Sequence, residues 1–273
     1  MSLLDRLERL LLPAVDRVYA RLPAPLPGAG RLQDCRLVAH RGAHDRPAVL
    51  ENTLAAFDAA LALGVWGVEL DIRWTRDLVP VVIHDAGLQR VFGLPQAVSR
   101  CTSEELAAIC PRVPKLADVI GRYGGRLHLM VEIKAEPTPE PSRQDRILGD
   151  LFAGLAPGVD FHMLALDPGL FRRVPFAPPR ACLPVARLNV SGFSRMAARA
   201  GYAGVAGHYR MVGGGTIRRQ HALGRKVGTG YAGSRSVMLR EAGRGVDWVF
   251  TNHASRMQSL LNQLIASGPS PGK

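Results

Sequence analysis

Titratable side chains recur at the carboxyl ends of the apolar runs that we expect to form strands. His40 ends one such run, Glu69 and Asp71 end a second, and Glu132 ends a third, while His84 ends a short run that follows the second. Charged groups are costly to bury unless they have partners. Their recurrence at the same end of successive runs therefore indicates one site.

The three carboxylates suggest a metal site. Glu69 and Asp71 are two residues apart, so in a strand both side chains point to the same face. Converging carboxylates, with no thiol or His-x-His pair beside them, suit Mg²⁺ or Ca²⁺ better than zinc. If Glu69 and Asp71 are considered without Glu132, they could instead form salt bridges with some of the many arginines. With Glu132 added, we expect a cation site.

Two histidines and two basic residues complete the expected chemistry. Phosphodiester hydrolysis needs a base for the attacking oxygen and an acid for the leaving alkoxide, and histidine titrates in the right range. His40 and His84 are the candidates for these roles. Arg41 and Lys134 would supply fixed positive charge for phosphate oxygens.

The elements that position these residues alternate between short apolar runs and helical patterns, which predicts a single (β/α)8 TIM-type barrel. The connection before Val79–His84 is too short for a parallel crossover, so this run should return as a hairpin. The expected strands are Leu37–His40, Gly67–Asp71, Leu127–Ile133, His162–Leu166, Ala181–Val185, Gly204–Ala206, Lys226–Thr229 and Trp248–Thr251. The expected helices are Thr53–Leu63, Lys115–Arg122, Asp145–Leu155, Phe193–Ala200, Thr216–Leu223 and Val237–Ala242.

Several motifs occur in the order that is typical of one enzyme family. They are His40-Arg41-Gly42, Glu51-Asn52-Thr53, Ala56-Phe57, Gly64, Glu69-Leu70-Asp71, Thr75 with Asp77, His84-Asp85, Pro114-Lys115-Leu116, Glu132-Ile133-Lys134 and Thr251-Asn252. Together they resemble the signature of the glycerophosphodiester phosphodiesterases. The resemblance covers nearly all of residues 36–255 and is densest from 40 to 134.

This resemblance implies a phosphoric diester hydrolase with one divalent cation on Glu69, Asp71 and Glu132. His40 and His84 would act as general acid and base. The family attacks the diester with the neighbouring glycerol hydroxyl and then hydrolyses the cyclic phosphate. The expected products are glycerol 3-phosphate and an alcohol.

The sequence departs from the family pattern around the substrate pocket. Eight residues separate Gly42 from Glu51, and the tryptophan expected in the seventh strand is replaced within Val227–Tyr231. Tyr231 could supply the missing ring, or the space could admit a bulkier group such as an acyl chain. The other expected pocket residues are Glu51, Asn52 and His208, and His44 and Tyr209 could lie near the mouth.

The ends of the chain are expected to lie outside the barrel domain. Residues 1–35 should form an amphipathic helix and a Pro/Gly-rich linker, residues 36–263 the barrel, and residues 264–273 a flexible tail. Apolar residues recur at helical spacing from 3 to 18. This helix could contact a membrane peripherally, although packing on its own domain is the commoner outcome for such a helix.

Composition and cysteine spacing argue against nucleic-acid binding, a zinc site and a disulfide scaffold. The net charge is +12, but the basic residues are spread along the chain, and no aromatic–basic interleaving indicates nucleic acid. The four cysteines have spacings that suit neither a zinc site nor a disulfide scaffold, which favours free thiols and the cytoplasm. The leading function is glycerophosphodiester hydrolysis. The alternatives are lysophospholipase D-type cleavage of lysophospholipids at a membrane surface and a non-catalytic barrel that binds a phosphorylated ligand.

Overall fold

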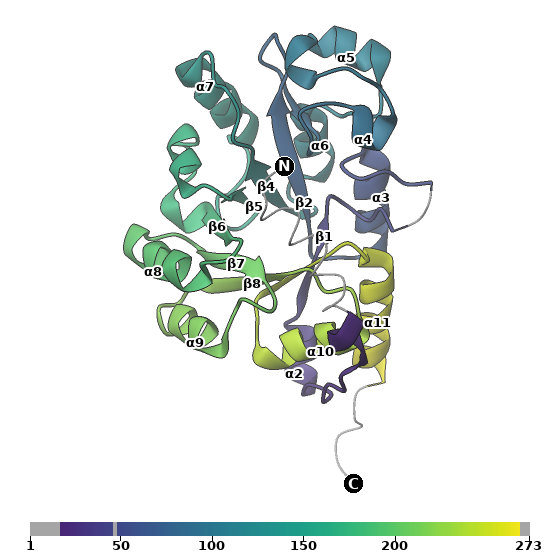
Figure 1. Cartoon of the computed structure of the whole chain (residues 1–273), viewed down its shortest axis with the longest axis vertical. Helices are drawn as coiled ribbons and strands as arrows, with labels where there is room; N and C mark the ends of the chain where they lie inside the picture. Colours follow the sequence, from purple (N-terminus) through teal and green to yellow (C-terminus); the bar gives the residue numbers. More distant parts are fainter. Residues whose placement is uncertain (1–16, 46–47, 268–273) are drawn as a thin grey trace.

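Eight parallel strands close into a barrel in the computed structural model, which describes residues 17–45 and 48–267. Each strand pairs with the next one around the barrel, and β1 pairs with both β2 and β9, so the sheet closes on itself (Figure 1). The expected TIM-type barrel is confirmed. Its strands are β1 (Arg36–His40), β2 (Gly67–Trp74), β4 (His128–Ile133), β5 (Phe161–Ala165), β6 (Cys182–Ala186), β7 (Gly204–His208), β8 (Lys226–Gly230) and β9 (Trp248–Thr251).

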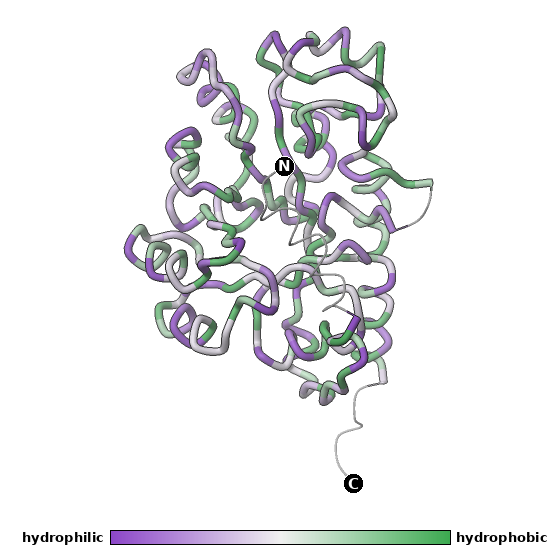
Figure 2. The backbone as a smooth tube through the Cα atoms, in the orientation of Figure 1, coloured by the Kyte–Doolittle hydropathy of each residue, from purple (hydrophilic) through white to green (hydrophobic). Residues whose placement is uncertain are grey.

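Helices pack around the outside of the barrel (Figure 1). Apolar and polar residues alternate along most of them (Figure 2), whereas the helix at Leu54–Leu63 is apolar except for Asp58. All six expected helices are present with shifted ends. The helices of the outer layer are α3 (Leu54–Leu63), α6 (Leu116–Tyr123), α7 (Pro141–Phe152), α8 (Val190–Ala200), α9 (Gly214–Ala222), α10 (Arg235–Arg244) and α11 (Ala254–Ala266).

The segment between β2 and α6 forms an excursion of its own. Strand β3 (Pro80–Val82) pairs antiparallel with β2, which confirms the expected hairpin. The chain then forms α4 (Gln89–Phe92), a 3-10 turn at Val98–Arg100 and α5 (Ser103–Ile109). A separate apolar cluster holds this excursion together, with Val81, Ile83, Leu88, Val98, Cys101, Leu106, Cys110 and Val113 as its buried members. The excursion was not anticipated beyond the hairpin itself.

The barrel interior contains its own apolar cluster, distinct from those between the sheet and the helices. Its buried members include Val38, Met130, Leu164, Trp248 and Phe250, which come from strands on opposite sides of the barrel. The interior is therefore a packed core below the mouth, as is usual for this fold.

The structure changes the expected boundaries at both ends of the barrel domain. Helix α2 (Ala29–Gln33) begins within the predicted linker, and α11 continues through Ala266, so residues 264–266 are helical rather than tail. Helices form there because their apolar residues pack on the barrel: Leu32 is buried in the same cluster as Leu261. Residues 17–21 are also helical, and Tyr19 packs on Tyr209 at 5.9 Å between ring centroids. Residues 3–16 of the predicted amphipathic helix, and 268–273 of the tail, lie outside the described residues.

Candidate active site

The turn after β1 places the backbone of the site in an unusual conformation. Arg41 and Asn52 have positive φ angles of 57° and 56°, and Gly42 has one of 82°. A Cβ atom on Gly42 would lie 2.7 Å from Cβ of Ala56, so this position requires glycine for two reasons. The Asn52 amide nitrogen donates to the Arg41 carbonyl at 2.9 Å, and this bond holds the two segments together.

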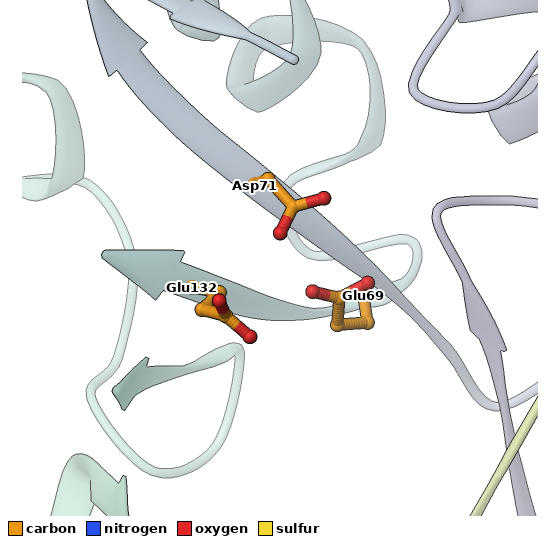
Figure 3. A group of neighbouring side chains, drawn as sticks. All are labelled: Glu69, Asp71 and Glu132. Atoms are coloured by element: carbon orange, nitrogen blue, oxygen red, sulfur yellow. The ribbon is translucent and has the colours of Figure 1, made fainter. Parts of the chain in front are cut away.

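The three carboxylates predicted to hold a metal converge where the middle of β2 lies beside the carboxyl end of β4 (Figure 3). One oxygen from each of Glu69, Asp71 and Glu132 lies within 4.8 Å of the other two. Glu69 and Asp71 are only 2% and 1% exposed. The convergence follows from register, because Asp71 pairs directly with Glu132 across the parallel ladder.

This cluster has the properties of a cation site. Oε1 of Glu69 is buried and has no hydrogen-bond partner among the described residues. Burial raises the pKa of Glu69 well above its ordinary value, and the nearby Asp71 and Glu132 raise it further. Burial would also raise the pKa of Asp71, but Lys134 and Arg41 outweigh it and hold that pKa below its ordinary value. A divalent cation would relieve the crowding, and the all-oxygen donor set fits Mg²⁺ or Ca²⁺.

Lys134 forms ion pairs with two of the three carboxylates. Its Nζ lies 2.6 Å from Oδ1 of Asp71 and also contacts Glu132. Asn52 donates to the other side of Asp71, from Nδ2 to Oδ2 at 2.8 Å. Asp71 is therefore held by hydrogen bonds from two sides. Asn52, which was expected to line the substrate pocket, binds this carboxylate and is not among the residues that line the neighbouring cavity.

His40 faces the carboxylate cluster from the end of β1. Its Nε2 lies 3.6 Å from Oε2 of Glu69, and its Nδ1 lies 2.6 Å from Oδ1 of Asn252, to which it donates. That hydrogen bond leaves Nε2 as the unprotonated nitrogen of the neutral ring. Burial lowers the pKa of His40 to about 3, with Arg41 adding to the effect. The ring is also held edge-on by Tyr231, at 4.8 Å between centroids.

His84 reaches the site on the returning hairpin. The Ile83 amide donates to the Asp71 carbonyl at 2.9 Å, and Nε of Arg73 donates to the His84 carbonyl at 2.8 Å. Nδ1 of His84 lies 2.7 Å from Oδ1 of Asp85. Burial lowers the pKa of His84, although the Asp85 hydrogen bond opposes that shift. The hairpin thus places His84 near Asp71, where the charge of that carboxylate acts on its ring.

A chain of ion pairs connects Arg41, beside the carboxylate cluster, to Asp85, beside His84. Nη1 of Arg41 donates to Oε1 of Glu51 at 2.9 Å, and its Nε lies 3.3 Å from Asp71. Arg90, from α4, bonds Glu51 through both terminal nitrogens and Asp85 through Nε. Burial would raise the pKa of Glu51, but Arg90 and Arg41 lower it to about 2. Glu51 therefore orients Arg41 instead of lining the cavity.

Two of the expected pocket residues, His208 and Tyr231, line a cavity beside the carboxylate cluster. The cavity has a volume of about 470 Å³ and also contacts His40, Glu69 and Glu132. Tyr209 is not among the residues that line the cavity: it is 2% exposed, packs in the apolar cluster outside the barrel and lies with its ring centroid 4.5 Å from that of His208. His44 is not among the residues that line the cavity.

Sequence reasoning missed the roles of Asn252, Arg73 and Arg90. Asn252 was part of a recognised motif, but its contact with His40 joins residues 212 positions apart. Arg90 follows the His84-Asp85 pair by a few residues, and no pattern in the sequence marks its contact with Glu51, 39 positions away.

Residues 40–150 match the model of the glycerophosphoryl diester phosphodiesterase family. The predicted family resemblance is confirmed. A glycerophosphodiester phosphodiesterase of Caldanaerobacter subterraneus is 33% identical over 124 residues, which are 41% of this chain and 50% of that protein. Human glycerophosphodiester phosphodiesterase 1 is 41% identical over 75 residues, 27% of this chain and 22% of that protein. The chain therefore spans half or less of the length of these curated relatives.

Solved structures of glycerophosphodiester phosphodiesterases share the fold over a longer range. The Thermotoga maritima enzyme has a TM-score of 0.69 at 20% identity and covers 82% of this chain and 97% of its own. An Oleispira antarctica phosphodiesterase in complex with the product sn-glycerol-3-phosphate has a TM-score of 0.68 at 22% identity, covering 83% and 96%. At these identities the likeness concerns the barrel. No helix among residues 17–45 and 48–267 is long and apolar enough to cross a membrane.

Proposed function

We propose that the protein hydrolyses glycerophosphodiesters to glycerol 3-phosphate and an alcohol. The observation that carries the proposal is the convergence of three carboxylates with a histidine 3.6 Å away, inside the stretch that matches the phosphodiesterase family. The comparisons favour this reaction over lysophospholipid cleavage at a membrane surface, which receives no support from them. A barrel that only binds a phosphorylated ligand would not need the two histidines.

In this proposal Glu69, Asp71 and Glu132 hold a divalent cation. The cation supplies Lewis-acid stabilisation to the phosphoryl oxygens when it is bound. Arg41 and Lys134 lie against the same carboxylates, so their remaining donors can bind the phosphate oxygens.

His40 and His84 move the protons. The unprotonated Nε2 of His40 can take the proton of the attacking glycerol hydroxyl, since Nδ1 is committed to Asn252. Asp85 stabilises the protonated form of His84, which can then give a proton to the departing alkoxide. Water subsequently opens the cyclic phosphate by the reverse proton movements.

The proposal is tested by release of glycerol 3-phosphate from glycerophosphocholine. We expect release that stops with EDTA and returns with Mg²⁺ or Ca²⁺, and the more effective ion identifies the cofactor. His221→Ala is the matched control for the histidine variants, because His221 pairs with Asp247 on the surface at the opposite end of the barrel. Absence of release with every divalent ion, from a protein shown to be folded, would refute the proposal.

A further inference from the structure

A second pocket, here called the basal pocket, lies at the end of the barrel opposite to the carboxylate cluster. Many of its lining residues begin a barrel strand or come directly before one, and none of them takes part in the proposed reaction. Its volume is about 570 Å³, which lies in the range of sites for small organic ligands. The lining residues that matter for its chemistry are Arg36, Trp66, His162, Arg180, Lys226 and Trp248.

The basal pocket is basic. Four cationic residues line it, Arg225 with Arg36, Arg180 and Lys226, and no acidic residue does. Nζ of Lys226 lies 2.9 Å from Oδ1 of Asp247, and Arg225 donates to backbone carbonyls. Within the described part of the chain, neither Arg36 nor Arg180 forms an ion pair, and both side chains are exposed. Two guanidinium groups without a carboxylate partner can bind an anion.

Aromatic rings form much of the remaining lining. The rings of Trp66 and Trp248 are stacked with 6.1 Å between their centroids, and His162 packs edge-on against Trp248 at 5.0 Å. Cζ of Arg36 lies 5.1 Å from the centroid of the Trp66 ring. Tryptophan rings and guanidinium groups both pack favourably on flat heterocycles. The pocket therefore offers positive charge and aromatic surface side by side.

Two polar groups lie among these rings. Nδ1 of His128 donates to the Val159 carbonyl at 2.8 Å, so Nε2 of its neutral ring can only accept. That nitrogen accepts from Nδ1 of His162 at 2.7 Å, which leaves Nε2 of His162 as an acceptor. Nε1 of Trp248 is a buried donor for which no described residue provides an acceptor. A donor and an acceptor set between rings are the groups that orient a heterocycle.

We propose that the basal pocket binds a small anion of the nucleotide type, in which an aromatic heterocycle carries phosphate. The heterocycle would lie among the rings of Trp66, His162 and Trp248, and the phosphate would bind Arg36 and Arg180. This site is separate from the carboxylate cluster, and the inference does not depend on the proposed function.

Isothermal titration calorimetry with ADP tests the proposal, since ADP joins a flat heterocycle to two phosphates. Pyrophosphate and adenosine test the two parts separately. We expect ADP to bind about tenfold more tightly than either fragment, because both parts contribute to its binding. A hydrogen bond to a charged group corresponds to about 10- to 100-fold in affinity. Arg36→Glu and Arg180→Glu should each weaken ADP binding by about that factor.

Arg112→Glu is the matched control. Arg112 is also exposed, and its Cζ lies 5.1 Å from the centroid of the Phe92 ring, the same distance as that between Arg36 and Trp66. This variant reverses a charge of the same kind outside the basal pocket, so it should bind ADP as the wild type does. Thermal unfolding shows whether each variant is folded.

Three results would overturn the inference: no binding of ADP, equal affinity for ADP and pyrophosphate, or ADP binding that survives in every folded variant of Arg36 and Arg180. The third result would place ADP elsewhere, for example at the carboxylate cluster. Should one of the two variants fail to fold, the other decides. The proposed function stands or falls separately, by the release of glycerol 3-phosphate.

Discussion

Arg90 is expected to control catalysis without touching the substrate. Its Nε lies 2.5 Å from Oδ2 of Asp85, and its terminal nitrogens lie 3.0 and 2.6 Å from the two oxygens of Glu51. Asp85 in turn holds His84, and Glu51 holds Arg41. Replacing Arg90 with alanine removes the one side chain that fixes both orienting carboxylates at once.

Arg90→Ala is expected to lower activity much more than it lowers the free energy of unfolding. Arg90 is 46% exposed, and exposed ion pairs contribute about 0.2–1 kcal/mol each, so the two pairs should stabilise the fold by roughly 0.4–2 kcal/mol. Activity is more sensitive, because a displacement of about 1 Å in a catalytic group can cost about 10²-fold. We therefore expect Arg90→Ala to lower kcat by about 10- to 100-fold, with a smaller change in KM.

A second arginine of the same excursion provides the control. Arg76 bonds both oxygens of Glu105 at 3.1 and 3.2 Å, and both side chains are more than half exposed. Arg76→Ala should therefore lose similar or less stability and retain full activity. Steady-state kinetics on glycerophosphocholine and urea unfolding of both variants measure the difference. If kcat of Arg90→Ala stayed within twofold of the wild type, or if Arg76→Ala lost as much activity, the positioning argument would be wrong.

Three further predictions concern single groups. His40→Ala and His84→Ala should each fold and lose about 10²- to 10⁴-fold in kcat, measured as glycerol 3-phosphate release; either variant with near wild-type kcat would exclude that histidine from proton transfer. Glu69→Gln should keep its melting temperature in EDTA but no longer gain stability from Mg²⁺ or Ca²⁺ in a thermal shift assay, whereas an undiminished gain would exclude Glu69 as a ligand. Burial lowers the pKa of His128 to about 4 and that of His162 to about 3, below the ordinary histidine value of 6.5. Their neutral forms are native, so the free energy of unfolding should be full above about pH 6.5 and fall as the pH decreases toward 4; urea unfolding that is independent of pH across this range would contradict this.

The fold was largely predictable because the barrel depends on local patterns that recur. Each of the eight expected strands is a short apolar run, helices separate most of them, and all eight are present; only 3-10 turns connect β5 to β6. The helix ends were less predictable, since they depend on caps. Pro141 begins α7 four residues before the expected start, and Gly64 ends α3 in a left-handed conformation as expected for a C-terminal glycine.

The candidate site was predictable to the extent that strand ends define it. Glu69, Asp71 and Glu132 converge because the parallel register forces residues at equivalent heights together. The groups that orient the catalytic side chains were not predictable, because Asn252 and Arg90 arrive from distant segments through tertiary packing. The same limit applied to residues 264–266, where Leu264 packs against the apolar cluster of Leu261, whereas the capping box of Thr102 and Glu105 that begins α5 is a local signal that the sequence contained.

The barrel divides its tasks between two arcs of strands. The arc from β1 to β4 carries the carboxylates and the side chains of His40, His84, Arg41 and Lys134, and from His40 onward it lies within the family match at residues 40–150. The arc from β5 to β9 contributes most of the residues that line the cavity beside the carboxylate cluster and lies beyond that match. The two arcs pair along β4–β5 and β1–β9, and Asn252 after β9 and Tyr231 after β8 both contact His40. The loops after β5 to β7 are therefore the part of the second arc in which substitutions can alter the size and polarity of the cavity while the first arc keeps its geometry. The scaffold is accordingly open to changes of specificity, by natural variation or by protein engineering, without reconstruction of its catalytic half.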